Sequence, residues 1–230
     1  MKNRSTVTAA FAAVMLGGTL FALPATAQDK GAAAPQNSGF LGDYARLATA
    51  PDNPKTKLWI DKSFDFKPYT KILLDPVEVW VSPTSEYKGA SPDVLKRMTD
   101  NFTASFKKAL QPGYTLVDKP GPDVLRIRLA ITGINLVKPD FKPTDALPIV
   151  FLFRAASGSM ESKNVVLTGE MQVMGPDNKI VAAALSTGTG DKAIEEKQSI
   201  TWKELQSITD TWAKGLRTRL DAARGVAAKS

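Results

Sequence analysis

Apolar residues recur at helical spacing in two long segments of the chain. The first, residues 91–113, carries one apolar stripe: Val94, Leu95, Met98, Phe102, Phe106, Ala109 and Leu110. Ser91 is placed to N-cap this helix, Pro92 suits its first turn, and a Pro-Gly pair follows its end. The second segment begins with the capping-box pair Thr201 and Glu204. Its stripe consists of Trp202, Leu205, Ile208, Trp212, Leu216 and Leu220. Both stripes predict amphipathic helices that face a core.

Alternation with a period of two predicts strands elsewhere. The clearest run is Val124–Val137, in which Leu125, Ile127, Leu129 and Ile131 alternate with Arg126, Arg128, Ala130 and Thr132. Gly133 indicates a bulge near the far end of this strand. Residues 165–174 and 179–186 flank the turn tetrapeptide Gly175-Pro-Asp-Asn178, which predicts a hairpin.

The patterns before the first helix are weaker. A β-rich run at residues 71–81 contains Pro76, which favours a bulge or an edge position there. Upstream, we expect a short helical turn laid against the body, with four apolar side chains: Phe40, Leu41, Tyr44 and Leu47. Residues 48–57 are rich in turn-forming Pro, Asp and Asn and predict a loop. A short strand is also expected at residues 114–117.

This order of elements predicts an α+β fold, with a mixed, mainly antiparallel sheet of about five strands and two amphipathic helices on one face. We expect four parts along the chain. They are a signal peptide at residues 1–27, a flexible tether at 28–37, a single α+β domain at 38–225 and a frayed tail at 226–230.

The first 27 residues have the pattern of an export signal. Lys2 and Arg4 precede an apolar, small-residue-rich run from Val7 to Leu23, and Ala25-Thr26-Ala27 is a small-x-small cleavage sequence. We therefore expect cleavage just before Gln28 and a periplasmic location in a Gram-negative-type bacterium. The run is too short and too rich in Ala and Gly for a membrane anchor, so no integral span is expected in the mature chain.

The sequence contains neither cysteine nor histidine, which narrows its chemistry. Without cysteine we expect no disulfide and no acylated anchor residue. Without histidine the usual base of a Ser or Cys triad and the commonest zinc ligand are missing, so we expect no cofactor and no metal. The chemistry that remains open is a pair of carboxylates, a Ser/Lys dyad or no catalysis at all.

The net charge of the mature chain is mildly positive. Removing Lys2 and Arg4 with the signal leaves 28 Lys and Arg against 23 Asp and Glu, a formal charge of +5 on a surface of mixed sign.

Arg126 and Arg128 stand on the same face of a predicted strand. They are suited to bind an anionic partner, such as a peptidoglycan carboxylate or a lipid phosphate. We favour the simpler interpretation that they form the polar face of a half-exposed strand, paired across to Glu170.

Gly188-Thr-Gly190 imitates a nucleotide-binding turn, but no βαβ unit follows it, and we interpret it as a turn that joins a strand to a helix.

The apolar stretch Ala146–Phe153 is too short to span a bilayer as a helix. We favour a buried strand or helix, because short apolar runs usually belong to the core. The alternative is an exposed loop that docks a partner or dips into a membrane, with Phe151 and Phe153 as its contacts.

Four motifs together resemble a bacterial envelope family known as domain of unknown function 3313. They are Ser38-Gly-Phe-Leu-Gly-Asp-Tyr44, Ile72-Leu-Leu-Asp-Pro-Val-Glu-Val-Trp80, Asp118-Lys-Pro-Gly-Pro-Asp-Val-Leu-Arg126 and Ala130-Ile-Thr132. The similarity runs from about Ser38 to Leu220. Many members resemble lipoproteins with a modified cysteine, whereas this chain has Gln28 after the cleavage sequence. In element order it is also similar to a domain shared by lipoprotein activators of penicillin-binding proteins and the curli secretion channel subunit. That likeness implies binding or assembly and carries over no catalytic residues.

The sequence therefore favours an exported accessory protein that binds another envelope protein or an anionic envelope polymer. Its candidate contacts are Phe151, Phe153, Arg126 and Arg128. An alternative is a periplasmic hydrolase that acts on glycan through two carboxyl groups, which would have to face one cleft roughly 5–10 Å apart. A third is a small-ligand binder, which requires an apolar pocket with convergent polar groups. No nucleic-acid partner is expected, and the oligomeric state stays open.

Overall fold

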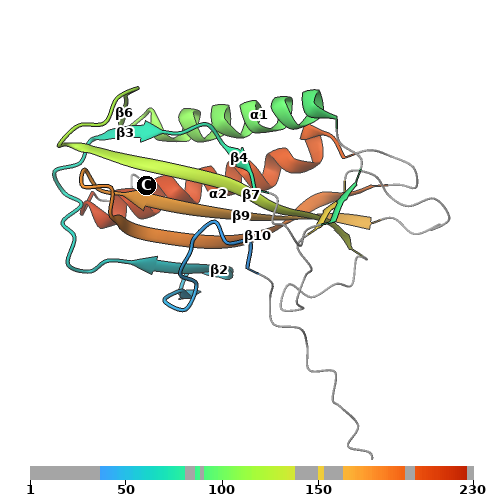
Figure 1. Cartoon of the computed structure of the whole chain (residues 1–230), viewed down its shortest axis with the longest axis horizontal. Helices are drawn as coiled ribbons and strands as arrows, with labels where there is room; N and C mark the ends of the chain where they lie inside the picture. Colours follow the sequence, from blue (N-terminus) through green and yellow to red (C-terminus); the bar gives the residue numbers. More distant parts are fainter. Residues whose placement is uncertain are drawn as a thin grey trace, which may run out of the picture. The chain divides into compact units, whose positions relative to one another are not determined.

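The computed structural model describes residues 37–80, 86–88, 91–137, 150–152, 163–194 and 200–226. Within these ranges, ten strands form one sheet (Figure 1). The continuous path across it is β1 (Ala48–Ala50), β2 (Asn53–Ile60), β10 (Ile180–Ile194), β9 (Lys163–Met174), β7 (Val124–Val137), β3 (Lys71–Leu74) and β6 (Thr115–Leu116). Off this path lie β4 (Glu78–Val79), β5 (Glu86–Lys88) and β8 (Val150–Leu152).

The sheet is mixed and mainly antiparallel. The ladders from β1 through β2, β10 and β9 to β7 are antiparallel, whereas β3 runs parallel to both β7 and β6. The predicted α+β class is confirmed. The expectation of about five strands was too low, because several short strands, such as the two residues of β4, have no readable alternation.

Both predicted helices form with the expected caps. In α1 (Pro92–Leu110) the Ser91 side chain accepts a hydrogen bond from the Val94 N–H, and α2 (Trp202–Ala223) begins with the capping box of Thr201 and Glu204. The two helices pack side by side and cover the same face of the sheet, here called the inner face (Figure 1).

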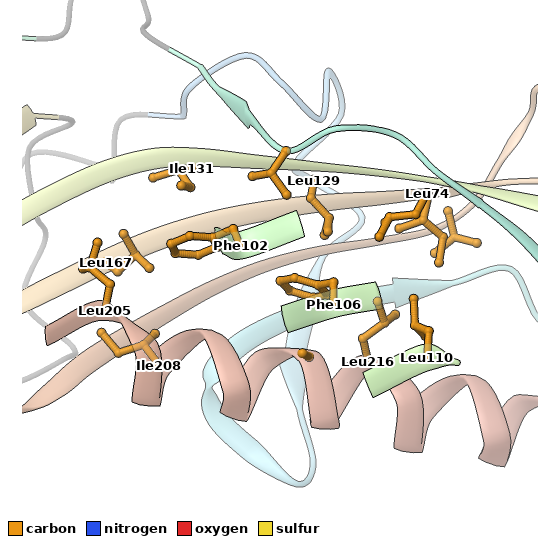
Figure 2. Close-up of a cluster of buried hydrophobic side chains, with 14 of the residues drawn as sticks. Leu74, Phe102, Phe106, Leu110, Leu129, Ile131, Leu167, Leu205, Ile208 and Leu216 are labelled. Atoms are coloured by element: carbon orange, nitrogen blue, oxygen red, sulfur yellow. The ribbon is translucent and has the colours of Figure 1, made fainter. Parts of the chain in front are cut away.

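The main core lies between the inner face and the helices. Phe102 and Phe106 of α1 point between the sheet and α2 (Figure 2). They meet strand residues such as Leu129 and helix residues such as Leu216. The alternation predicted for β7 holds, because Leu125, Ile127, Leu129 and Ile131 are all buried in this cluster. The bulge expected at Gly133 is present as a register shift against β9.

The predicted hairpin is β9–β10, and its turn is closed by a hydrogen bond from the Gly175 N–H to the Lys179 carbonyl oxygen, 2.9 Å. Pro76 interrupts the β-rich run as expected, since β3 ends before it and β4 resumes along β7 after it.

Three local expectations were wrong. Residues 38–47 form bends and turns rather than a helical turn, and residues 48–57 form β1 and the start of β2 rather than a loop. Gly188-Thr-Gly190 lies inside β10 and is not a turn. The reason is close packing: a Cβ on Gly188 would lie 2.2 Å from Cγ2 of Ile208, so the missing side chain lets α2 approach the strand.

Candidate functional site

The face of the sheet opposite the helices, the outer face, is covered in part by residues 38–47, here called the clasp. Phe40 and Leu41 of the clasp are buried against Ala130 of β7 and Ala183 of β10. These alanines make room for the clasp, because larger side chains at their positions would occupy the space that Phe40 fills. The clasp therefore belongs to the folded body.

Hydrogen bonds fix the clasp through Tyr44. Its hydroxyl donates to the Glu170 carboxylate over 2.6 Å and accepts from the N–H groups of Gly39 and Leu41, and it also lies 3.0 Å from the Ser38 hydroxyl. Glu170 is only 3% exposed, so the tyrosine supplies a needed partner to a buried acid. Burial first, and the hydrogen bond to Glu170 second, raise the pKa of Tyr44 above its ordinary value.

Two side chains, one from β9 and one from the residue after β4, bind the clasp backbone. The Trp80 indole N–H donates to the Ser38 carbonyl oxygen over 3.1 Å, and the Gln172 amide donates to the Phe40 carbonyl oxygen over 3.1 Å. The rings of Phe40 and Trp80 meet edge to face, 5.4 Å apart. Two motifs of the sequence resemblance, the one ending at Tyr44 and the one ending at Trp80, thus make direct contact here.

Beside the clasp, Arg126 and Arg128 project from β7 on the outer face, and each is held by an acid from the Pro76 region. Arg126 Nη2 lies 2.8 Å from the Asp75 carboxylate and Arg128 Nη2 lies 3.0 Å from that of Glu78. The hydrogen bond to Asp75 raises the pKa of Arg126. The parallel pairing of β7 with β3 and β4 brings these charges together.

The expected pairing of the arginines with Glu170 was wrong. In the β7–β9 register, Glu170 stands opposite Ala130, while Arg128 stands opposite Gln172. Arg128 accordingly donates to the Gln172 side-chain oxygen over 3.3 Å, and its guanidinium lies 5.0 Å from the centre of the Phe40 ring. Arg128 thus links the strand face to the clasp.

The carboxylates near this face already have partners. Asp75 and Glu78 are paired with the two arginines, and Glu170 accepts from Tyr44. A glycosidase needs two carboxyl groups that share a cleft, one as acid and the other as base or nucleophile. Asp75, Glu78 and Glu170 are thus each engaged with a different partner, and a pair of carboxyl groups that share one cleft stays a prediction.

The apolar stretch Ala146–Phe153 is described only at β8. The backbone of Phe151 pairs with Ile134 of β7 and Tyr87 of β5. Phe153 and the burial of the Phe151 side chain lie outside the described residues, so their role as contacts stays a prediction.

One feature escaped sequence reasoning. A cavity of about 240 Å³ lies on the inner face, lined by residues of α1, α2 and four strands. Its walls include Gly169, Ala184 and Gly215, and small residues at inward-facing positions are the signal that would have indicated it.

No helix in the described ranges is long and apolar enough to cross a membrane. Across the same ranges, no group of three or more acidic, Cys or His side chains is placed to hold a metal ion.

The fold and the clasp define a single-sheet α+β domain whose motifs meet on one face. Residues 36–216 match the model of the family described as protein of unknown function DUF3313, and the chain belongs to this family. The chain is 25% identical over 183 residues to an uncharacterized lipoprotein, YdcL, of Escherichia coli; the match covers 76% of this chain and 81% of the relative.

The solved structures that match this chain do so with low similarity. The PelC dodecamer from Paraburkholderia phytofirmans has a TM-score of 0.35 and 8% identity, covering 75% of this chain and 98% of that one. A minor lipoprotein from Acinetobacter baumannii has a TM-score of 0.35 and 12% identity, covering 68% and 93%.

Proposed function

We propose that this protein is an exported accessory protein of the cell envelope that acts by binding a partner protein, and that the outer face around Arg126 and Arg128 is its contact surface. The lipoprotein relative supports the envelope part of the proposal. The observation that carries the binding part is the arrangement of the arginines, which are held in place by Asp75 and Glu78 while their side chains remain 41% and 28% exposed.

A preformed arginine pair beside aromatic residues suits a protein interface. Arg and Trp are among the residues that contribute most binding energy at such interfaces, and side chains that are already ordered lose little entropy on binding. Trp80 and the Arg128-covered ring of Phe40 lie at the edge of this surface. A protein of mixed charge fits it better than a polyanion, because each arginine already has an acidic neighbour that a polyanion would meet as a like charge.

The test is affinity capture of the C-terminally tagged full chain from its native bacterium after brief chemical cross-linking, with captured proteins identified by mass spectrometry. We expect one reproducible envelope protein, and we expect its yield to fall about tenfold in Arg126→Gln. The matched control is Lys96→Gln, which also removes a cation from a surface pair with an aspartate, Asp100, but on α1. Equal yields from the two variants, or capture of glycan polymer in place of a protein, would overturn the proposal.

A further inference from the structure

The cavity on the inner face is separated from the arginine surface by the sheet itself, so an inference from it is independent of the proposed function. Much of its lining is apolar and comes from both layers: Phe102, Phe106, Leu129, Ile131, Met171 and Leu216. Figure 2 shows the two phenylalanines reaching from α1 toward the strands beside Leu129. At about 240 Å³ it exceeds the roughly 150 Å³ apolar cavity that accepts benzene in another protein.

Small residues leave this space unfilled. Gly169 is not one of them, because the Trp212 ring packs against it and would lie 2.5 Å from a Cβ there. Ala184 of β10 and Gly215 of α2 face the remaining volume with almost no side chain. Protein interiors are normally packed to the density of organic crystals, so the gap is a specific property of these positions.

An exposed ion pair lies at one side of the cavity, while the polar lining residues Thr56 and Glu170 are buried. Asp52 in the turn between β1 and β2 is 64% exposed, and its carboxylate lies 2.8 Å from Nη2 of Arg219. Thr56 and Ser186 line the same cavity, and their hydroxyl oxygens are 3.0 Å apart. The structure thus combines a largely apolar lining with an arginine, Arg219, that is already paired with the exposed carboxylate of Asp52.

We propose that this cavity binds a small carboxylate with an apolar body, of the size of a short fatty acid, whose head group takes the place of Asp52 at Arg219. Exposed ion pairs contribute little free energy, so exchange of one carboxylate for another costs little, while burial of the apolar body drives binding. The volume equals about eight water molecules at about 30 Å³ each, which is too small for a two-chain lipid.

Calorimetric titration of the purified full chain with octanoate tests the site. We expect saturable one-to-one binding that weakens at least about tenfold in Ala184→Leu, because the added side chain fills the cavity. Arg219→Gln should weaken octanoate binding and leave octanol binding unchanged. Asp52→Asn should strengthen octanoate binding, because it removes the competing carboxylate; a merely structural role of Asp52 predicts no such gain. Absence of saturable binding, or undiminished binding in Ala184→Leu, overturns the proposal.

A second measurement needs no variant. With methionine methyl groups labelled for NMR, octanoate should shift the signal of Met171, which lines the cavity. Met174 is the internal control: it lies on the same strand, opposite Arg126 of the outer-face arginine pair. An unmoved Met171 signal at saturating octanoate, or equal shifts at both methionines, would contradict binding in this cavity.

Discussion

The two faces of the sheet are covered by different physical means. On the inner face, α1 and α2 bury a large continuous apolar cluster, in which Phe102 is 1% exposed. On the outer face, the clasp buries only a small cluster and depends on directed bonds, such as those from Tyr44 to Glu170 and from Trp80 to Ser38.

This difference teaches how one sheet serves two purposes. Apolar burial is strong and non-directional, so the helix layer can supply most of the stability and still tolerate a cavity. Hydrogen bonds contribute less net free energy, but they fix positions, and a missing partner is costly. We therefore expect the outer face to contribute less to the free energy of unfolding than the inner face, while its hydrogen bonds fix the positions of its side chains more narrowly.

The largest expected effect is on the inner face. Phe102→Ala should lower the free energy of unfolding by about 3–5 kcal/mol, because it removes a fully buried ring from the main core. Urea denaturation measures this. Phe40→Ala is the matched change in the clasp and should cost less, because its cluster is small and can relax toward solvent. Equal losses would show that the two faces contribute alike.

Close packing of α2 on β10 should give the next largest effect. Gly188→Ala should cost about 1–3 kcal/mol, because its Cβ would collide with Ile208. Gly133→Ala is the control: its nearest contact would be an ordinary 3.5 Å, to Thr168. The two variants are compared by thermal and urea unfolding, and a Gly188→Ala protein as stable as the control would contradict this account of the glycine.

On the outer face, Tyr44→Phe should cost about 1–2 kcal/mol, since it leaves the buried Glu170 without its donor. The clasp should also become more sensitive to limited proteolysis while the helix layer stays protected. Tyr69→Phe serves as the control, because the Tyr69 hydroxyl makes no hydrogen bond to a described residue. Similar proteolysis of both variants would argue against a role for the hydroxyl.

The smallest effect is a pH dependence. The pKa of Tyr44 is raised in the folded state by burial and by the bond to Glu170. The contribution of the Tyr44 hydroxyl to the free energy of unfolding is therefore fully present below the unfolded pKa of about 10. It is lost as the pH rises through the folded pKa. We expect the stability difference between wild type and Tyr44→Phe to stay constant at lower pH and to shrink as the pH rises above about 10 in urea titrations. A constant difference would contradict the raised pKa.

Local patterns were sufficient for much of the fold. The spacing of Met98, Phe102 and Phe106, the cap at Ser91 and the turn at Gly175 all have the structures that the sequence predicts. Each depends on residues a few positions apart, and the sequence displays these relations directly.

The candidate sites depended on relations that no local pattern shows. The pairing of Arg126 with Asp75 follows from the register of β7 against β3, whose residues are about fifty positions apart. The clasp has no hydrophobic periodicity, because its side chains contact separate residues on β7, β9 and β10. The cavity arises only where the small residues of two layers, such as Ala184 and Gly215, face each other.

The order of strands in the sheet also governs when the protein can fold. Ile60 of β2 pairs with Ala182 of β10, so the edge formed by β1 and β2 has no partner strand until almost the whole chain is available. Such distant pairings slow folding, because a long loop must be closed before any contact compensates for it. During synthesis from the N-terminus, the β1–β2 pair and the clasp must therefore wait without the rest of the sheet, and Phe40 stays uncovered until the hairpin near the other end of the chain has been made.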